Sequence, residues 1–290
     1  MVPRINDAIA SSSSRQRCIR LITCCVCLLA AIPEARSQAR AQDRTAHVNG
    51  MDMHYQVLGS GEPLILLHGF GGCGEDWQPI VEVFAKQYQV IIPDLRGHGA
   101  STNPTKTFSH RQSALDVFTL LDQLDLQRIK AMGISSGGMT LLHMATSQPG
   151  RIDAMVLIGT TTYFPEQARK IMAVSGQIMP PEVRAMYQRC AKRGEAQVHE
   201  LIDEFTSFKD SYEDMNFTPP LLGTIKARTL IVQGDRDPFF PVNIPTEMYQ
   251  AIPGSALWIV PRGGHVPIFG PRQQEFETIA SEFLQSGGQN

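Results

Sequence analysis

The segment AMGISSGGM, residues 131–139, contains the pattern Gly-x-Ser-x-Gly with Ser135 at its centre. An apolar run precedes the serine and an amphipathic segment follows it, which predicts a sharp strand-to-helix turn at Ser135. Such a turn presents the serine hydroxyl at the carboxyl edge of a sheet, and the flanking glycines let strand and helix approach closely. The Ser136 N–H would lie in the first helical turn, where it can stabilise an anion. The alternative is a simple helix-capping serine.

A serine nucleophile needs a base, and the base needs an acid that orients it. For a serine at this kind of turn the expected chain order is serine, acid, histidine. The segment LIVQGDRDP delivers Asp235 and Asp237 beyond a predicted strand, and PRGGHVP places His265 beyond the next strand. Asp237 is preferred over Asp235 because it lies further past the strand end. Two alternatives stay open: Asp237 could serve a local turn, and His265 could be an isolated surface or core histidine.

The stretch LLHGFGGCGEDW, residues 66–77, has the pattern G-x-G-x-x-G after an apolar run, and Asp94 lies 20 residues beyond its last glycine. This combination is typical of a nicotinamide dinucleotide site. The same glycines could instead form a loop that holds a negative oxygen during acyl transfer. The dinucleotide interpretation is disfavoured because a predicted hairpin precedes the strand and because the helix is expected to begin at Asp76–Trp77, beyond Gly74. It also leaves the serine, aspartate and histidine above unexplained.

The elements that must position these residues are predicted by the hydrophobic pattern. Two short alternating runs around Asn49-Gly50 predict an antiparallel hairpin. Near-continuous apolar strands then alternate with amphipathic helices, which indicates an α/β fold with a mostly parallel central sheet and helices on both faces. In the helix expected over residues 109–124, the buried face is predicted to hold Leu115, Phe118, Leu121 and Leu124.

Between about residues 161 and 222 the strands stop, and amphipathic segments predict a helical cap insertion. Four methionines in this stretch suit a plastic apolar pocket: they are Met172, Met179, Met186 and Met215. Apolar side chains that could line such a pocket are Phe70, Phe164, Phe239, Phe240 and Ile268. Ordinary core packing is equally open for each of them.

Residues 1–41 differ in composition from the rest of the chain. Arginines precede the apolar stretch LITCCVCLLAAI, and the small-residue pattern Ala39-x-Ala41 follows, which predicts a signal peptide and a secreted or periplasmic protein. The stretch is too short for a membrane span. Residues 42–290 would form the mature domain, with 20 Lys and Arg against 26 Asp and Glu. Because no basic cluster occurs, nucleic acid is not an expected partner.

Cys73 and Cys190 are the cysteines outside the predicted signal peptide. They are far apart in sequence and nothing local argues for pairing, so free, buried thiols are expected. No H-x-x-H or C-x-x-C pattern occurs in the predicted mature chain, and no metal is expected. His68 and His98 are expected to order the loops in which they lie. Spacing suggests no partner for the other histidines: His47, His54, His110, His143 and His199.

Five short motifs together resemble the α/β-hydrolase family, in its lid-bearing branch with a serine nucleophile. They are HGFGG (68–72), PDLRGHGAS (93–101), GISSGG (133–138), GDRDP (234–238) and GGH (263–265), and the resemblance covers about residues 46–288. It implies that Ser135 is the nucleophile, His265 the base and Asp237 the acid that orients it. It also implies that the backbone N–H groups of Phe70 and Ser136 bind the oxyanion. The family usually has Met or Leu where Ser136 stands, which leaves a backbone role unaffected.

The expected function is hydrolysis of small-molecule or lipid-like carboxylic esters through an acyl-enzyme, without a cofactor. Relatives in the resembled family also cleave lactones or carbon–carbon bonds or catalyse perhydrolysis, and these alternatives stay open. The dehalogenases and epoxide hydrolases of this fold are disfavoured, because they use an aspartate where Ser135 stands. A non-enzymatic ligand receptor on the same scaffold is a further alternative.

Overall fold

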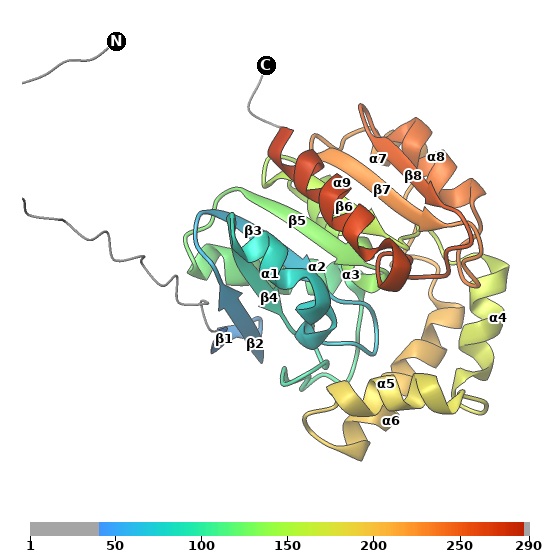
Figure 1. The fold of residues 1–290 in the computed structure, drawn as a ribbon. Coiled ribbons are helices and arrows are strands. Elements are labelled where there is room, and N and C mark those ends of the chain that lie inside the picture. Colours follow the sequence, from blue (N-terminus) through green and yellow to red (C-terminus); the bar gives the residue numbers. More distant parts are fainter. Residues whose placement is uncertain (1–40, 287–290) are drawn as a thin grey trace, which may run out of the picture. The chain divides into compact units, whose positions relative to one another are not determined.

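The computed structural model describes residues 41–286, so the predicted signal peptide lies, except for Ala41, outside the described residues. An eight-stranded sheet forms the centre, in the order β1-β2-β4-β3-β5-β6-β7-β8 (Figure 1). The strands are β1 (Gln42–Val48), β2 (Met51–Leu58), β3 (Glu62–Leu67), β4 (Tyr88–Pro93), β5 (Ile129–Ile134), β6 (Ile152–Ile158), β7 (Arg228–Gly234) and β8 (Ala256–Val260). β1 and β2 form the predicted hairpin, and all pairs from β4 to β8 are parallel. The predicted α/β sheet is confirmed.

Helices fill the connections between the strands. They are η1 (Gly74–Trp77), α1 (Gln78–Ala85), α2 (His110–Gln123), α3 (Ser136–Ser147), α4 (Glu166–Ser175), α5 (Pro181–Cys190), α6 (Glu195–Ser207), η2 (Phe208–Asp210), α7 (Pro219–Leu222), α8 (Asn243–Ala251), η3 (Gly270–Arg272) and α9 (Gln273–Gln285), where η marks a 3₁₀ helix. Each parallel crossover thus passes through at least one helix, as parallel strands require.

Each face of the sheet has its own apolar core. In β3, Leu64 and Leu66 belong to the cluster under α1 and α9, whereas Ile65 and Leu67 belong to the cluster on the opposite face with α2, α3 and α8. Figure 1 shows α1 and α9 lying together across one face of the sheet. Because both faces are covered, the four successive residues 64–67 of β3 are all fully buried. This double burial is the physical reason for the near-continuous apolar strands in the sequence.

Two local expectations were wrong. Leu115 is 49% exposed, because the buried stripe of α2 runs through His110, Ala114, Val117 and Leu121. The helical conformation after β3 begins at Gly74 with the 3₁₀ turn η1, not at Asp76–Trp77. The helix start therefore does not argue against a dinucleotide site, whereas the hairpin β1–β2 ahead of β3 still does.

Between β6 and β7, over the stretch where an insertion was expected, the structure has the helices α4 to α7 and, in place of a strand, one isolated bridge between Tyr163 and Asn216. We call residues 161–222 the helical insert. Figure 1 shows α4, α5 and α6 beyond the carboxyl ends of the parallel strands. Arg169 on α4 donates to the carbonyls of Phe164, Lys209 and Ser211, which ties α4 to the segment that follows α6. Within residues 41–286, the helices are too short or too polar to cross a membrane.

Candidate active site

Ser135 lies on a strained turn between β5 and α3. Its backbone has φ 50° and ψ −112°, a conformation that non-glycine residues rarely adopt. Glycines around it make room for close packing: a Cβ on Gly137 would be 2.1 Å from the Leu67 carbonyl oxygen. A Cβ on Gly133 would be 2.5 Å from the backbone of Gly137. The glycines of the Gly-x-Ser-x-Gly pattern are thus required by backbone contacts that fix where the Ser135 hydroxyl lies.

The structure brings the three predicted triad residues together. His265 Nε2 is 2.9 Å from Ser135 Oγ, and His265 Nδ1 is 2.8 Å from Asp237 Oδ2. These are hydrogen-bond distances. They join side chains from three loops that follow β5, β7 and β8 at the carboxyl edge of the sheet. Parallel strands place such loops at one edge, so residues separated by up to 130 positions meet there.

Asp237 is held as a buried, hydrogen-bonded carboxylate. It accepts hydrogen bonds from the backbone N–H groups of Phe239 (2.7 Å) and Phe240 (3.2 Å) and from the Gln233 amide (2.7 Å). Burial raises the pKa of Asp237, but the hydrogen bond and charge of His265 and the two N–H donors outweigh burial and lower the pKa below its ordinary value. A carboxylate only accepts, so Nδ1 of His265 donates to Asp237 and a neutral ring keeps Nε2 free to accept the Ser135 proton.

Asp235, the alternative acid, is exposed. Its backbone N–H donates to the carbonyl of Val260, the last residue of β8. The residue two positions later, Asp237, is the one that reaches His265.

Two backbone donors are available beside Ser135. Phe70 lies in the loop after β3, and Ser136 is the first residue of α3. Among residues 41–286, neither N–H is the donor in any backbone hydrogen bond of a turn, loop or helix cap. An N–H in the first turn of a helix has no helical acceptor and favours a negative charge. Both donors border the same cavity as Ser135 and His265.

The loop that carries Phe70 is braced by His68, as expected, and also by Asp94. The Leu95 N–H donates to His68 Nε2 (2.9 Å), so the ring donates through Nδ1 to the Gly69 carbonyl (2.8 Å). Asp94 accepts from the N–H groups of Gly74 (2.8 Å) and Ala100 (2.9 Å). Asp94 stands at the sequence distance from the glycines that is typical of a ribose-binding acid in a dinucleotide site. In this structure it instead holds two loops together.

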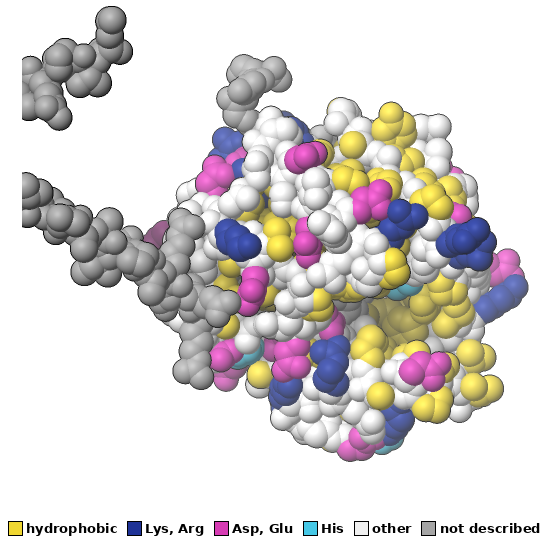
Figure 2. Space-filling model, in the orientation of Figure 1, with side chains coloured by type: hydrophobic (Ala, Val, Ile, Leu, Met, Phe, Trp, Pro, Cys, Tyr) yellow, Lys and Arg dark blue, Asp and Glu magenta, His cyan; other side chains and the backbone are white. Residues whose placement is uncertain are grey.

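A cavity of about 770 Å³ opens above Ser135 and His265, between the sheet edge and the helical insert. Its walls are largely apolar, and Figure 2 shows a hollow lined by hydrophobic side chains. Seven phenylalanines border it: Phe70, Phe164, Phe205, Phe208, Phe239, Phe240 and Phe269. Of the insert methionines, Met172, Met179 and Met186 also border it, whereas Met215 is buried in the core instead.

Ile268 does not belong to this cavity. Its side chain is fully buried in the core cluster under α1 and α9, on the opposite face of the sheet from the insert. Val266 and Phe269 of the same loop border the cavity instead. The loop after β8 crosses the sheet edge on its way to α9, so its side chains divide between the cavity and that core. The expectation for Ile268 was wrong.

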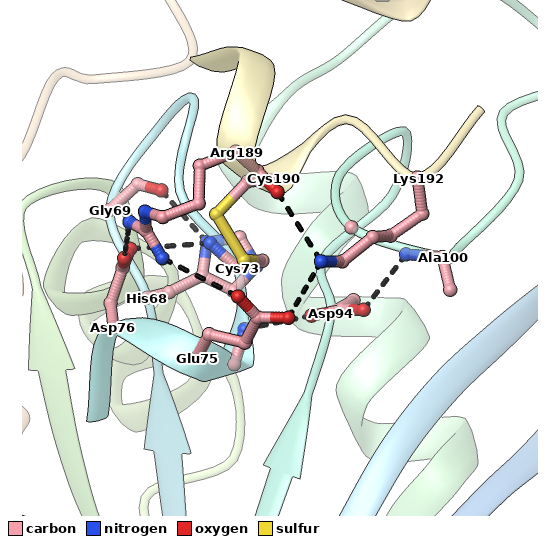
Figure 3. The surroundings of a disulfide bond; sticks show 12 residues. His68, Gly69, Cys73, Glu75, Asp76, Asp94, Ala100, Arg189, Cys190 and Lys192 are labelled. Atoms are coloured by element: carbon pink, nitrogen blue, oxygen red, sulfur yellow. Dashed lines mark hydrogen bonds and ion pairs between the residues drawn. A yellow bond between two sulfur atoms is a disulfide. The ribbon is translucent and has the colours of Figure 1, made fainter. Parts of the chain in front are cut away.

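Cys73 and Cys190 form a disulfide, which corrects the expectation of free thiols. Their Cα atoms are 5.5 Å apart, although 117 positions separate them in sequence. Figure 3 shows the bond joining the start of η1 to the end of α5. Asp76 also lies close to the two sulfur atoms, but these are bonded to each other and offer no thiolate to a metal ion.

Ion pairs flank the disulfide (Figure 3). Arg189 pairs with Asp76, and Lys192 lies 2.6 Å from Glu75. Tyr187, one turn earlier on α5, packs over Gly71, where a Cβ would be 2.5 Å from its ring. The end of α5 is therefore fastened to the loop that carries Phe70.

One group of polar residues was not found from the sequence. His110 Nδ1 is 2.6 Å from Asp214 Oδ2, and His110 Nε2 is 3.0 Å from Ser136 Oγ. Asp214 lies in the helical insert, 104 positions from His110, and no motif or spacing connects them. His54 also has partners, Asp94 (2.9 Å) and Asp43 (3.2 Å), which come from paired strands.

Comparison with known proteins identifies the family of this chain. A sequence model described as alpha/beta hydrolase fold matches residues 62–197. The protein named serine hydrolase BPHL from Homo sapiens is 30% identical over 252 residues, covering 82% of this chain and 84% of that protein. The chain belongs to the α/β-hydrolase family. The BPHL protein of Mus musculus is 29% identical over 274 residues, covering 90% of this chain and 92% of that protein.

Among solved structures, this α/β-hydrolase is similar to the enol-lactonase from Burkholderia xenovorans LB400. The TM-score is 0.71 at 22% identity, and the match covers 84% of this chain and 100% of the other. At this identity the likeness shows the fold alone.

Proposed function

We propose that this α/β-hydrolase is a serine hydrolase that cleaves carboxylic esters through an acyl-enzyme. The observation that carries the proposal is the hydrogen-bonded chain of Ser135, His265 and Asp237 at the floor of an apolar cavity. The similarity to proteins named serine hydrolase supports the use of a serine nucleophile.

In the first half of the reaction, Ser135 Oγ attacks the ester carbonyl carbon while His265 Nε2 takes the hydroxyl proton. The carbonyl oxygen becomes negative and accepts hydrogen bonds from the N–H groups of Phe70 and Ser136. Donors of this kind lower the barrier because they face the charge only as it develops. The tetrahedral intermediate then collapses, the ester C–O bond breaks, and His265 gives its proton to the departing alcohol.

In the second half, His265 Nε2 removes a proton from water, whose oxygen attacks the acyl carbon bound to Ser135. The same N–H groups stabilise the second oxyanion. Collapse breaks the acyl–serine bond, the proton returns to Ser135, and the carboxylic acid leaves. Throughout, the ionised Asp237 stabilises the imidazolium form of His265 and fixes its orientation.

The cavity sets the class of substrate. Its volume of about 770 Å³ lies in the range of sites for small organic ligands. The phenylalanine and methionine walls favour an apolar acyl or alcohol group, and burial of each CH₂ contributes about 0.8 kcal/mol. The unbranched methionines of the helical insert can adapt to substrates of different shape. We therefore expect small-molecule or lipid-like esters.

We also propose that the protein is exported and that residues 1–41 are removed. The disulfide between Cys73 and Cys190 supports this, because such bonds persist mainly in oxidising compartments. Amino-terminal sequencing of protein from the periplasm and medium of a bacterial host would test it. A new terminus near Gln42 is expected, and an uncleaved chain confined to the cytoplasm would contradict export.

The experiment that tests the function is a panel of 4-nitrophenyl esters of graded acyl length, run with the mature protein and with Ser135→Ala. A simple γ-lactone is included to compare lactone with ester hydrolysis. We expect turnover of the apolar esters and a loss of at least about a thousandfold in kcat/KM for Ser135→Ala. Retention of the rate by the alanine variant would show that the proposed mechanism is wrong.

A further inference from the structure

A second hydrogen-bonded Ser–His–Asp chain lies directly beside the first. Ser136 Oγ is 3.0 Å from His110 Nε2, and His110 Nδ1 is 2.6 Å from Asp214 Oδ2. Ser136 is the residue after the nucleophile and borders the cavity. His110 is fully buried behind it, at the start of α2. The mechanism above uses only the backbone N–H of Ser136, so the side-chain hydroxyl and its two partners have no role in it.

The direction of the hydrogen bonds in this chain follows from Asp214. Burial raises the pKa of Asp214, but the hydrogen bond and charge of His110, with the backbone N–H groups of His110 (2.8 Å) and Arg111 (3.1 Å), outweigh burial and hold the pKa well below its usual range. An ionised carboxylate only accepts, so His110 donates through Nδ1. In its neutral form the ring carries its proton on Nδ1 and accepts at Nε2. In that form the Ser136 hydroxyl donates to His110.

This arrangement leaves the Ser136 oxygen as an acceptor. Its proton is committed to His110, and its remaining lone pairs can only accept a hydrogen bond. The chain that ends in an ionised carboxylate polarises the hydroxyl and strengthens it as an acceptor. The rings of Phe108, Phe164 and Phe208 surround His110 at centroid distances of 5.2, 6.0 and 5.4 Å, which keeps other donors away from the imidazole.

The matching substrate group is a neutral hydroxyl. An ammonium group would need a carboxylate partner in this largely apolar cavity. The carboxylates that border it, Glu75 and Asp76, already pair with Lys192 and Arg189. A neutral donor needs no such compensation.

The position of the hydroxyl follows from the backbone. In the proposed mechanism the N–H of Ser136 binds the carbonyl oxygen of the ester, and Oγ belongs to the same residue, which borders the cavity. A group that reaches Oγ must therefore sit within two or three bonds of the scissile carbonyl. We propose that Ser136 is a specificity residue that accepts a hydrogen bond from a hydroxyl on the second or third carbon of the acyl chain. His110 and Asp214 are positioning residues, which orient the Ser136 hydroxyl without touching substrate. This inference rests on the proposed ester hydrolysis.

The test compares three 4-nitrophenyl esters, of butyrate, 2-hydroxybutyrate and 3-hydroxybutyrate. For each enzyme variant the ratio of kcat/KM for each hydroxy ester to that for butyrate is measured, so intrinsic ester reactivity and general loss of activity cancel between variants. We expect the ratio for at least one hydroxy ester to fall about tenfold in Ser136→Ala, the value of one good hydrogen bond. His110→Gln, which breaks the chain one step further back, is expected to lower the same ratio about threefold.

His143→Gln is the matched control. His143 Nε2 lies 2.7 Å from the Asp214 carbonyl oxygen and so contacts the same residue without reaching Ser136. The ratio of kcat/KM values measured for His143→Gln should equal that of the wild type. This control separates recognition of the hydroxyl from a general disturbance of the structure around Asp214. Equal ratios in wild type and Ser136→Ala, with all three esters cleaved, would overturn this inference and leave the ester hydrolase intact. Failure of the wild type to cleave any of the three, or full activity of Ser135→Ala, would overturn the proposed function and this inference with it.

Discussion

Removal of the disulfide between Cys73 and Cys190 is expected to destabilise the protein strongly. The bond closes a loop of 117 positions. In the chain-entropy treatment, a loop of that length lowers the entropy of the unfolded chain by the equivalent of about 5 kcal/mol at 25 °C. Native disulfides typically contribute about 2–4 kcal/mol. For Cys73→Ala/Cys190→Ala we therefore expect a loss of about 3 kcal/mol in the free energy of unfolding.

The assay is urea denaturation of the oxidised wild type, the wild type under reductant and the double variant. The reduced wild type and the double variant should have the same free energy of unfolding. Arg189→Gln is the matched control, because it removes the neighbouring ion pair with Asp76 and keeps the disulfide. An exposed ion pair of this kind contributes at most about 1 kcal/mol. Alkylation of the unfolded, non-reduced wild type should detect no free thiol at either position. Two free thiols, or equal stability of the wild type and the double variant, would refute the linkage.

Three further predictions concern single residues. Asp237→Asn is expected to lower kcat by about 10³–10⁴-fold, because an amide at this position no longer fixes the Nδ1–H tautomer of His265. Asp235→Asn is the control, and an equal loss of kcat in the two variants would contradict the assignment of Asp237 as the acid. Burial raises the pKa of Glu204 from its ordinary value of 4.5 to about 7. The native carboxyl keeps its proton where the unfolded one has lost it, so stability should fall by up to about 3 kcal/mol as pH rises from about 4 to 8. Urea titrations of Glu204→Gln should show this dependence removed, and an unchanged pH profile would count against it. Gly137→Ala should cost at least about 2 kcal/mol of stability because its Cβ would meet the Leu67 carbonyl, whereas Gly150→Ala, with open space around it, should be nearly neutral in the same denaturation assay.

The architecture and the relative order of the chemically active residues could be predicted from local signals. Apolar strands alternating with amphipathic helices define a parallel sheet, and the carboxyl ends of its strands meet at one edge. The residues after three such strands, Ser135, Asp237 and His265, therefore had to lie near one another. The structure adds the hydrogen-bond distances between them.

Contacts made by the helical insert could not be predicted in the same way. Its helices do not connect neighbouring strands of the sheet, so the sheet does not fix their positions. The positions of α5 and of the segment around Asp214 therefore depend on tertiary contacts alone. The disulfide and the His110–Asp214 pair both join the insert to the core over more than 100 positions. Leu115 is exposed although Phe118 and Leu121 of the same predicted face are buried, because tertiary packing decides how wide the buried stripe of α2 is.

The covalent acyl-enzyme is the most direct test of the proposed chemistry. Mature protein is mixed with excess 4-nitrophenyl butyrate, quenched in acid within the first turnover and analysed by intact mass and peptide mapping. We predict a mass increase of one butyryl group on the peptide that contains Ser135, together with a burst of nitrophenolate. Both should be absent from Ser135→Ala. An acyl group on a different residue, or ester turnover by Ser135→Ala at the wild-type rate, would contradict the proposal that Ser135 is the nucleophile.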